Sequence, residues 1–501
     1  MFISEKALSK FVRIVKWSVK VEADVAMDLI NNKWEPMDVE DALELVGPNT
    51  KHPGLRRYAI SRLNSAKDEQ LEIYLPQLVQ ALKYENQAVS LDEDEENITD
   101  NLDLASFLID RAKNVHGLAN SLFWNLHIET EERDYGKMYK EILERFLAET
   151  EFKEILERQL NFIQSLVKVF EKVTKIRNRD RAVDEMRKTF SETEKSEFNF
   201  TSFEPIPFPL DPSISICGII PDDSTLFKST VRPAKLTFLK PNGDKYETIF
   251  KVGDDLRQDQ LVLQIISLMD DLLKKENLDL KLTPYRALAT SSNHGFVQFV
   301  KAKGVRDILE KESILEFLQK YNASKSEPNG VTKECMDTYV KSCAGYCVIT
   351  YILGIGDRHL DNLMMTENGN LFHIDFGFIL GRDPKPFPPP MKLNKDMIAV
   401  FDPQRTPQNY AAFKNYCQTA FENLRRNASL ILNLFGLMVD SSVPEIALEP
   451  DKAVKKVQDK FLLHLTEEEA GMHLQKIIDE SAKALFPDII DWLHGLAMIV
   501  K

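Results

Sequence analysis

The chain carries the hexapeptide Asp-Arg-His-Leu-Asp-Asn at residues 357–362 and the tripeptide Asp-Phe-Gly at residues 375–377. Transfer of a phosphoryl group from a nucleotide depends mainly on positioning and charge stabilisation, so it needs few protein groups. It needs an amide or oxygen ligand and a carboxylate for a divalent cation, and a group beside the attacking hydroxyl. Asn362 and Asp375 have the type, order and spacing of such a metal-holding pair, and His359 can exchange a proton near neutral pH. These segments predict a phosphotransferase that uses ATP with Mg²⁺ or Mn²⁺.

The composition is that of an ordinary globular protein, with 43% hydrophobic and 28% charged residues among 501. Such a length predicts about two to four domains. The net charge of −14 disfavours a general nucleic-acid binder, so we expect no nucleic-acid partner. The five cysteines lack the paired clusters of structural zinc sites and are expected to be buried free thiols. No apolar run reaches membrane-spanning length, which predicts a cytoplasmic protein that meets membranes only peripherally.

Residues 1–150 are predicted to form a solenoid-like domain of stacked helices. Apolar residues recur at helical spacing between Asp68 and Tyr84, and the breaks between such segments are short. A single long charged helix is expected over about residues 150–189, because its apolar positions form one face.

Strand patterns replace the helical spacing after residue 213. The predicted strands cover residues 214–220, 235–239, 246–252, 285–290 and 295–300. A helix is expected at 259–275, and helices dominate again from residue 305. This order predicts an α+β, bilobal, protein-kinase-like catalytic domain. The expected divisions are a helical domain at 1–150, a linker helix and smaller lobe at 151–300, and a larger lobe at 301–501.

Two features of the smaller lobe are candidates for phosphate binding. A lysine on a buried strand is costly unless it meets an anion, which makes Lys251 a candidate, with Lys235 on the neighbouring strand as its competitor. The turn at residues 226–232 lies between the first two strands, where a loop over the phosphates belongs. It has no glycine pattern, so an ordinary hairpin is equally compatible with it.

The order Asp-Arg-His at 357–359 reverses the His-Arg-Asp of protein kinases and resembles the phosphatidylinositol 3-kinase family. The string Phe-Lys-Val-Gly-Asp-Asp-Leu-Arg-Gln-Asp at 250–259 is similar to the same family. Residues 341–354 and 381–392 resemble its class III members in particular. The resemblance implies a helical accessory domain followed by a lipid kinase domain. An N-terminal C2 domain, normal for that family, is not visible, which suggests a fragment or a truncated form.

The resemblance also implies roles for individual residues. The expected ATP-binding residues are Phe227, Lys228, Ser229, Lys251, Asp259, Tyr285, Gln298, Phe299 and Val300. The expected metal ligands are Asn362 and Asp375, and the expected catalytic residues are Asp357, Arg358 and His359. His359 is either a general base or a stabiliser of transferring charge, and Arg358 is alternatively part of a structural ion pair.

The segment after Asp375 is expected to hold the lipid headgroup. Arg382, Lys385 and Lys392 supply cations there, although a rigid loop with solvated lysines is the alternative. Related enzymes that use phosphorylated inositides carry longer basic runs, so the resemblance favours phosphatidylinositol as substrate and phosphatidylinositol 3-phosphate as product. A protein Ser/Thr kinase and a non-catalytic scaffold are the competing functions. A protein kinase needs a peptide-accepting loop, and the intact catalytic residues argue against a scaffold.

The C-terminal residues after Pro487 place their apolar side chains on one helical face. That face is expected either to dock on the kinase core or to lie in a membrane interface. Family resemblance further implies a regulatory kinase-like subunit and a Beclin-type partner, with work on endosome and autophagosome membranes in trafficking and autophagy.

Overall fold

The computed structural model describes residues 8–87, 103–192, 198–229, 231–386, 388–401 and 406–485. The chain forms two compact units, each assembled from segments that are distant in the sequence. The first comprises Met1–Gln260, Arg286–Phe299 and Asn433–Val443. The second comprises Leu261–Tyr285, Val300–Leu432 and Pro444–Lys501. The apolar segment after Pro487, for which a C-terminal helix was predicted, lies outside the described residues.

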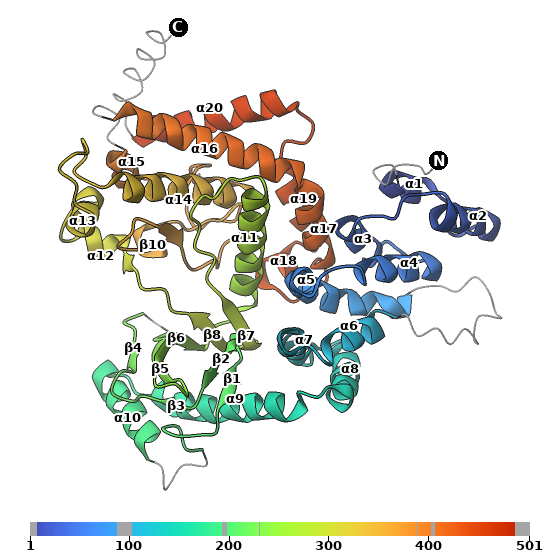
Figure 1. The fold of residues 1–501 in the computed structure, drawn as a ribbon, viewed down its shortest axis with the longest axis horizontal. Coiled ribbons are helices and arrows are strands. Elements are labelled where there is room, and N and C mark those ends of the chain that lie inside the picture. Colours follow the sequence, from blue (N-terminus) through green and yellow to red (C-terminus); the bar gives the residue numbers. More distant parts are fainter. Residues whose placement is uncertain are drawn as a thin grey trace. The chain divides into compact units, whose positions relative to one another are not determined.

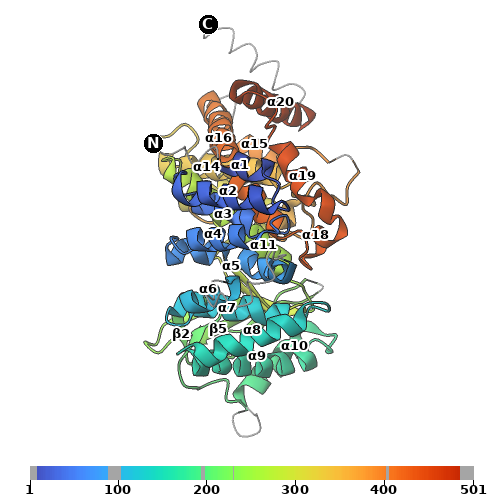
Figure 2. The same cartoon turned by 90° about the vertical axis from the view of Figure 1, so that its right-hand side faces the viewer.

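The first unit begins with an array of short helices that follow one another (Figure 1, Figure 2). They are α1 (Leu8–Ile14), α2 (Lys20–Asn32), α3 (Val39–Leu45), α4 (Pro53–Leu63), α5 (Asp68–Ala81), the 3-10 turn η2 (Leu82–Gln87), α6 (Leu104–Ala112), α7 (His116–Glu129) and α8 (Gly136–Glu149). Helix α7 lies against α5, α6 and α8. It is buried on most of its surface, with Phe123 and Trp124 at most 1% exposed. An array of this kind is what the apolar spacing predicts.

The long helix expected over residues 150–189 is two helices, and that prediction was wrong. Helix α9 spans Lys153–Val173 and α10 spans Arg179–Ser191. Asn178 separates them, because its side chain accepts a hydrogen bond from Arg181 N at 2.9 Å and caps the start of α10. Asparagine is among the strongest N-cap residues. The helical spacing of apolar residues on both sides hid this cap.

The sheet of the first unit has strands in the order β3-β5-β6-β8-β7, with β4 paired to β5. Its strands are β3 (Gly218–Ile219), β4 (Thr225–Leu226), β5 (Ala234–Leu239), β6 (Lys245–Val252), β7 (Ala287–Ser291) and β8 (His294–Gln298), with a separate ribbon of β1 (Ile206–Phe208) and β2 (Asp211–Ile216). The described pairings are antiparallel. The expected strand over 214–220 is therefore divided between β2 and β3.

One face of this sheet packs against α9, and the other carries the two candidate phosphate lysines. Phe238 and Phe250 pack against Phe162 and Phe170 of α9, at centroid distances of 6.0 and 5.3 Å, and form the core. Side chains alternate between faces along a strand, and directly paired residues share a face. Lys251 pairs with Gly295, and Lys235 pairs with Ile249. Both lysines therefore lie on the face away from α9.

Residues 433–443 complete the first unit through polar contacts with its helices. The buried ammonium of Lys83 in η2 donates to the carbonyl of Asp440 at 3.0 Å. The hydroxyl of Tyr84 donates to Oδ2 of the same residue at 2.8 Å. Arg257, at the start of α11 (Arg257–Lys275), donates to the hydroxyl of Ser442 and pairs with Asp255. The carboxylate of Glu129 lies 3.8 Å from Lys83.

The second unit is mainly helical around the buried helix α14 (Lys333–Ile352). Its other elements are β9 (Lys303–Gly304), α12 (Val305–Leu309), α13 (Ile314–Tyr321), the 3-10 turn η4 (Leu360–Asn362), β10 (Leu363–Met365), β11 (Leu371–His373), α15 (Lys395–Val400), α16 (Pro407–Arg426), α18 (Pro444–Leu448), α19 (Pro450–Lys460) and α20 (Glu467–Leu485). Helix α17 (Ala428–Leu437) begins in this unit and continues into the first unit from Asn433. Helix α14 packs on α16, α19 and β11. All five cysteines are free thiols, as predicted, and those at 335, 343, 347 and 417 are buried. Cys217 of the first unit is partly exposed, so its predicted burial was wrong. Within the described ranges, no helix has the length and apolarity needed to cross a bilayer.

Candidate active site

In the second unit, two loops carry the predicted catalytic and metal-binding residues. Residues 353–356 lead to His359, and residues 378–381 follow Asp375. Three backbone hydrogen bonds of 2.8–2.9 Å join these stretches, from Leu380 N to Leu353 O, from Gly381 N to Gly354 O and from Gly356 N to Phe378 O. Gly354 has a φ of +57°, and a Cβ there would lie 2.4 Å from the nitrogen of Gly381. Only glycine permits this approach, so the sequence fixes the register of the two loops.

The side chain of Arg358 bridges the same two loops. Its guanidinium donates to the carbonyls of Gly356 at 2.8 Å and Ile374 at 2.7 Å, and to the carbonyl of Asp375. Its charge also lies 5.7 Å from the ring centroid of Phe376. These contacts give Arg358 a structural role through backbone carbonyls, whereas the ion pair offered as its alternative stays a prediction. A direct catalytic role for Arg358 stays a prediction.

The two predicted metal ligands offer hard oxygen atoms. Asn362 is buried, and its Nδ2 donates to the carbonyl of Asp357 at 2.9 Å, so its Oδ1 is the atom available to a cation. Asp375 is exposed at a φ of +61°, with only a 3.4 Å contact from Gly377 N to its carboxylate.

One amide and one carboxylate fit a cation that takes its remaining ligands from nucleotide phosphates and water. No described group of three or more His, Cys, Asp and Glu side chains is arranged to hold a metal without such help.

His359 lies between two carboxylates. Its Nδ1 accepts a hydrogen bond from Asp361 N at 3.2 Å and lies 3.4 Å from Asp361 Oδ2, while its Nε2 lies 3.7 Å from Asp357 Oδ2. A hydrogen bond from Arg306 lowers the pKa of Asp361, so this carboxylate stays ionised. With Nδ1 as an acceptor, the neutral ring carries its proton on Nε2, which also lies 3.4 Å from Asn362 Nδ2. For Nε2 to act as a base the ring must take the other tautomer, in which the Nδ1 proton faces Asp361 Oδ2 at 3.4 Å. If both nitrogens carry protons, the two carboxylates stabilise the imidazolium.

Asp383 is a site residue that sequence reasoning missed, because it was counted only as a negative charge among the cations. Its Oδ2 accepts from Lys392 Nζ at 3.0 Å and from Asp357 N at 3.2 Å, and its Oδ1 accepts from Lys385 N at 2.9 Å. Burial opposes ionisation, but these donors hold the pKa of Asp383 below its ordinary value. The Asp-Pro pair at 383–384 is a recognisable turn signal, since Asp often binds the backbone N–H two residues on.

The three predicted headgroup cations have different surroundings. Arg382 is paired with Glu445 at 2.7 Å, and Lys392 is paired with Asp383 while its side chain is only 10% exposed. Lys385 is exposed, and the described residues offer its ammonium no ion pair. Lys385 is therefore the cation most available to an anionic ligand.

In the first unit, both candidate phosphate lysines take part in partly exposed ion pairs. Lys235 is ion-paired with Glu247, and its ammonium lies 4.6 Å from the ring centroid of Phe299. Lys251 donates to Asp254 at 2.8 Å across the start of the Gly-Asp-Asp turn. An ion pair that is partly exposed contributes little, so a nucleotide phosphate can replace or join Asp254.

The candidate phosphate loop is anchored at both ends. Arg179 of α10 donates to the carbonyl of Leu226 at 2.9 Å, and Arg232, with a φ of +47°, donates to carbonyls between α9 and α10. Lys228 and Ser229 are exposed between these anchors, and Phe227 is half-buried. The loop thus presents a hydroxyl and an ammonium from a fixed base.

The predicted adenine-binding residues are distributed over both units. In the first unit, Gln298 accepts from Arg286 N at 3.0 Å through its side chain, and Asp259 lies half-buried in the first turn of α11. In the second, Tyr285 is 6% exposed with its ring centroid 6.1 Å from that of Phe372. Val300 is half-buried. Their assignment to an adenine pocket stays a prediction.

Comparison with known protein families finds a match in the N-terminal part of the chain and another in the C-terminal part. Residues 1–158 match the family "Phosphoinositide 3-kinase family, accessory domain (PIK domain)". Residues 245–313 and 309–448 match the family "Phosphatidylinositol 3- and 4-kinase". These matches confirm the predicted fold class, a helical domain followed by an α+β kinase-like catalytic domain.

Three curated relatives align with nearly the whole chain. "Phosphatidylinositol 3-kinase pik3" of Schizosaccharomyces pombe is 44% identical over 99% of the chain and 62% of the relative. "Phosphatidylinositol 3-kinase VPS34" of Arabidopsis thaliana is 44% identical over 99% and 61%. The Saccharomyces cerevisiae protein of the same name is 40% identical over 99% and 61%. The chain thus spans somewhat less than two thirds of the length of these relatives.

Proposed function

The chain belongs to the phosphatidylinositol 3-kinase family, and we propose that it is the catalytic part of a class III lipid kinase. In this proposal it transfers the γ-phosphate of ATP to the 3-hydroxyl of phosphatidylinositol. One observation carries the proposal: Asn362, Asp375 and His359 are presented by two loops whose register is fixed by backbone hydrogen bonds. The relatives named phosphatidylinositol 3-kinase support the lipid as substrate.

The chemistry follows from where each group lies. Asn362 Oδ1 and the Asp375 carboxylate would hold a divalent cation, which neutralises charge on the transferring phosphoryl group when bound. Lys251, Lys228 and Ser229 would bind the nucleotide phosphates. His359 would take the proton of the lipid hydroxyl or stabilise the transferred charge. Arg358 and Asp383 would act as positioning residues, because they bind backbone atoms of both loops.

The remaining features of the proposal concern the lipid and the setting. Family kinases use ATP with a divalent cation, and we propose Mg²⁺ or Mn²⁺. Because Arg382 and Lys392 are already paired, the segment offers few free cations, which favours the unphosphorylated headgroup. We further propose domain divisions at 1–150, 151–300 and 301–501, a kinase-like regulatory partner with a Beclin-type subunit, and peripheral work on endosome and autophagosome membranes.

The test uses purified chain, labelled ATP, Mg²⁺ or Mn²⁺, and vesicles. Separate vesicle sets contain phosphatidylinositol, its 4-phosphate or its 4,5-bisphosphate, and products are resolved by headgroup. We expect phosphatidylinositol 3-phosphate as the main product. Label on a different hydroxyl, or transfer only to added protein, would overturn the proposal.

Asp375→Asn is the matched control for this assay. Loss of one metal carboxylate is expected to remove several kcal/mol of charge stabilisation, which is about a 10³-fold loss of rate. The melting curve should stay unchanged, since the carboxylate makes only a long contact with Gly377 N. Unchanged turnover in a normally folded variant would remove Asp375 from the mechanism.

A further inference from the structure

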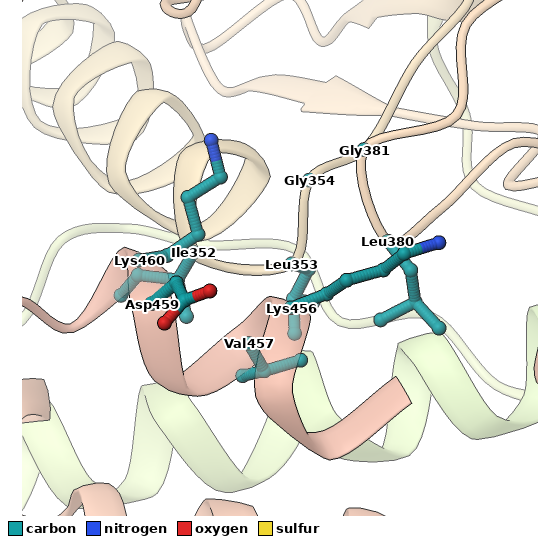
Figure 3. A pocket seen from close by; sticks show the side chains of 9 residues that line it. All are labelled: Ile352, Leu353, Gly354, Leu380, Gly381, Lys456, Val457, Asp459 and Lys460. Carbon is teal, nitrogen blue, oxygen red and sulfur yellow. The ribbon is translucent and has the colours of Figure 1, made fainter. Parts of the chain in front are cut away.

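A pocket of about 220 Å³ opens in the second unit at the base of the two catalytic loops (Figure 3). Its wall combines the end of α14, the loop stretches that carry the backbone hydrogen bonds, and α19. The lining residues are Ile352, Leu353, Gly354, Leu380, Gly381, Lys456, Val457, Asp459 and Lys460. Four of them supply the backbone that holds the two loops in register, but none of their side chains is among the groups proposed to bind the nucleotide, the cation or the lipid.

The interior of the pocket is apolar. Ile352 and Val457 are fully buried, and Leu353 and Leu380 are at most 5% exposed. A cavity of about 150 Å³ lined by such residues suffices for benzene. This pocket therefore has room for a ring or a short alkyl chain.

The rim of the pocket is basic. In Figure 3, Lys456 extends beside Leu380 and Lys460 rises along α14. The one acidic lining residue, Asp459, is paired with Lys455 at 2.7 Å, and Lys456 is paired with Glu449 at the surface. Surface pairs of this kind exchange readily for a ligand.

Of the two lysines at the rim, Lys460 has the fewer favourable contacts for its charge. Its ammonium lies 4.9 Å from the ring centroid of Tyr351, and the described residues give it no ion pair. It is half-buried, and it faces the charge of Lys392 as well as that of Asp459. Burial and Lys392 lower the pKa of Lys460, whereas Asp459 raises it. An anionic group at this rim would offset both the burial and the repulsion.

The pocket is connected directly to the catalytic loops. Leu353 and Gly354, which line it, accept the backbone hydrogen bonds from Leu380 and Gly381, which also line it. Gly354, Leu380 and Gly381 all have φ angles between +55° and +80°. A positive φ is unfavourable for leucine, so this backbone is held by its surroundings. A ligand in the pocket would contact the structure that keeps His359 and Asp375 in register.

We propose that this pocket binds a small amphipathic anion, and that binding changes the rate of phosphoryl transfer by holding the two loops together. The apolar body enters between α14, α19 and Leu380, and the anionic group meets Lys460 and Lys456. A short fatty acid and an aromatic acid share this chemistry. The binding part of the inference is tested without turnover and stands apart from the proposed function, whereas the regulatory part rests on the proposed phosphoryl transfer.

The binding test uses the full chain with a non-hydrolysable ATP analogue, which occupies the nucleotide site. Octanoate and 3-phenylpropionate are titrated by ligand-observed NMR, each beside its neutral amide. We expect each acid that binds to exceed its amide by about tenfold, the worth of one hydrogen bond to a charged group. Binding of octanoate alone would indicate a lipid-derived ligand, and binding of phenylpropionate alone an aromatic metabolite.

Helix α19 supplies matched variants. Lys460→Met keeps the apolar stem beside Tyr351 and removes the charge, and it should weaken the acids about tenfold. Gln458→Ala, at an exposed position of the same helix outside the pocket, should bind as the parent does. Three results would overturn the proposed binding site: equal affinity for acid and amide, no binding of either acid, or unchanged affinity for the acids in Lys460→Met.

The regulatory part of the inference has its own readouts. A bound acid should slow hydrogen exchange at residues 353–356 and 378–381 and change kcat with little change in the KM for ATP. Both effects should disappear in Lys460→Met. Binding that leaves exchange and kcat unaltered would overturn the link to catalysis.

Discussion

Asp357 and Asp375 both have positive φ angles, +50° and +61°, which non-glycine residues adopt rarely. Such strain persists only where the surroundings fix it, and it concentrates at functional sites. Here Arg358 and Asp383 bind the backbone beside both residues. At the scale of single residues, the site is therefore a set of reactive side chains on backbone held by other side chains.

His359→Ala is expected to lower lipid phosphorylation by at least ~10²-fold, the usual scale for loss of a general acid or base. Affinity for ATP should stay similar, because the described contacts of the ring are with its own loop. Steady-state rates and nucleotide titrations on the same preparation measure both. A variant that binds ATP much more weakly would make His359 a binding residue.

Lys385 and Lys392 are expected to differ when each is replaced by alanine. Lys385→Ala removes an exposed charge worth up to ~1 kcal/mol, so lipid phosphorylation should fall about fivefold and basal ATP hydrolysis should not. The difference should shrink at high salt, which screens exposed charges. Lys392→Ala removes the cation that pairs with Asp383, so both activities should fall.

Measuring lipid phosphorylation and hydrolysis side by side decides between these roles. Loss of both rates in Lys385→Ala would mean that Lys385 shapes the loop. A selective loss of the lipid reaction in Lys392→Ala would return Lys392 to headgroup binding.

The residues of the proposed metal site could be predicted from the sequence, whereas the residues that contact them could not. Asn362 and Asp375 were predicted because their chemistry and their spacing from His359 are local properties of the chain. The role of Asp383 could not be predicted in this way, because its partner Asp357 N lies in another loop. Similarly, only the structure shows that Lys235 is paired with Glu247 and Lys251 with Asp254, and the phosphate-binding role of Lys251 stays a prediction.

At the scale of elements, polar clusters decide which helices and segments stay together. Lys83 in η2 is buried near Glu129 of α7 and bound to the segment around Asp440. Burial raises the pKa of Glu129, which Lys83 opposes. A buried charge left without its partner is strongly destabilising, typically by 3–5 kcal/mol.

Lys83→Met is therefore expected to lower the free energy of unfolding of the first unit by roughly 3–5 kcal/mol. Hydrogen exchange should accelerate in α7 and in residues 433–443, while α14 of the second unit keeps its protection. Lys83→Met combined with Glu129→Gln should recover part of the loss, because the unpaired acid is gone. Exchange that is unchanged in both segments would show that the cluster does not hold them.

The prediction of helix boundaries was wrong where one polar side chain ends a helix within a continuous apolar pattern. The cap at Asn178 divides α9 from α10, and sequence spacing alone gave one helix. The hairpin of β5 and β6 was predicted well, because the Pro-Asn-Gly-Asp turn at 241–244 is a strong local signal. Local signals thus set most elements, and long-range contacts set which of them belong together.

At the scale of the whole molecule, one buried and three half-buried histidines make stability depend on pH. Burial lowers the pKa of His116, His127, His294 and His373. The unfolded chain binds protons at these residues near pH 6.5, whereas the folded chain binds them only at lower pH. The contribution of these histidines to the free energy of unfolding is therefore complete above about pH 6.5. It decreases as the pH falls toward the pKa values of the folded state.

The melting temperature is expected to fall between pH 7.0 and 5.5 at constant ionic strength, by about 2–4 °C for each kcal/mol lost. His294→Gln, which stays neutral throughout, should show a smaller fall. Glu129 acts in the opposite sense, because its raised pKa lets the folded state take up a proton first. A melting temperature that is constant over this range would contradict the prediction.

The first unit is complete only when residues 433–443 have joined it, which has a consequence for how the protein is made. A ribosome adds about 5–20 residues per second, so the chain through Phe299 waits roughly 7–27 seconds for Asn433. During that interval Lys83 and Tyr84 have not yet met Asp440, and a nascent helical domain exposes a charged, unfinished face. A chaperone that covers this face would favour correct assembly, and nascent chains stalled before residue 433 should be more sensitive to protease at η2 than chains stalled well beyond residue 443.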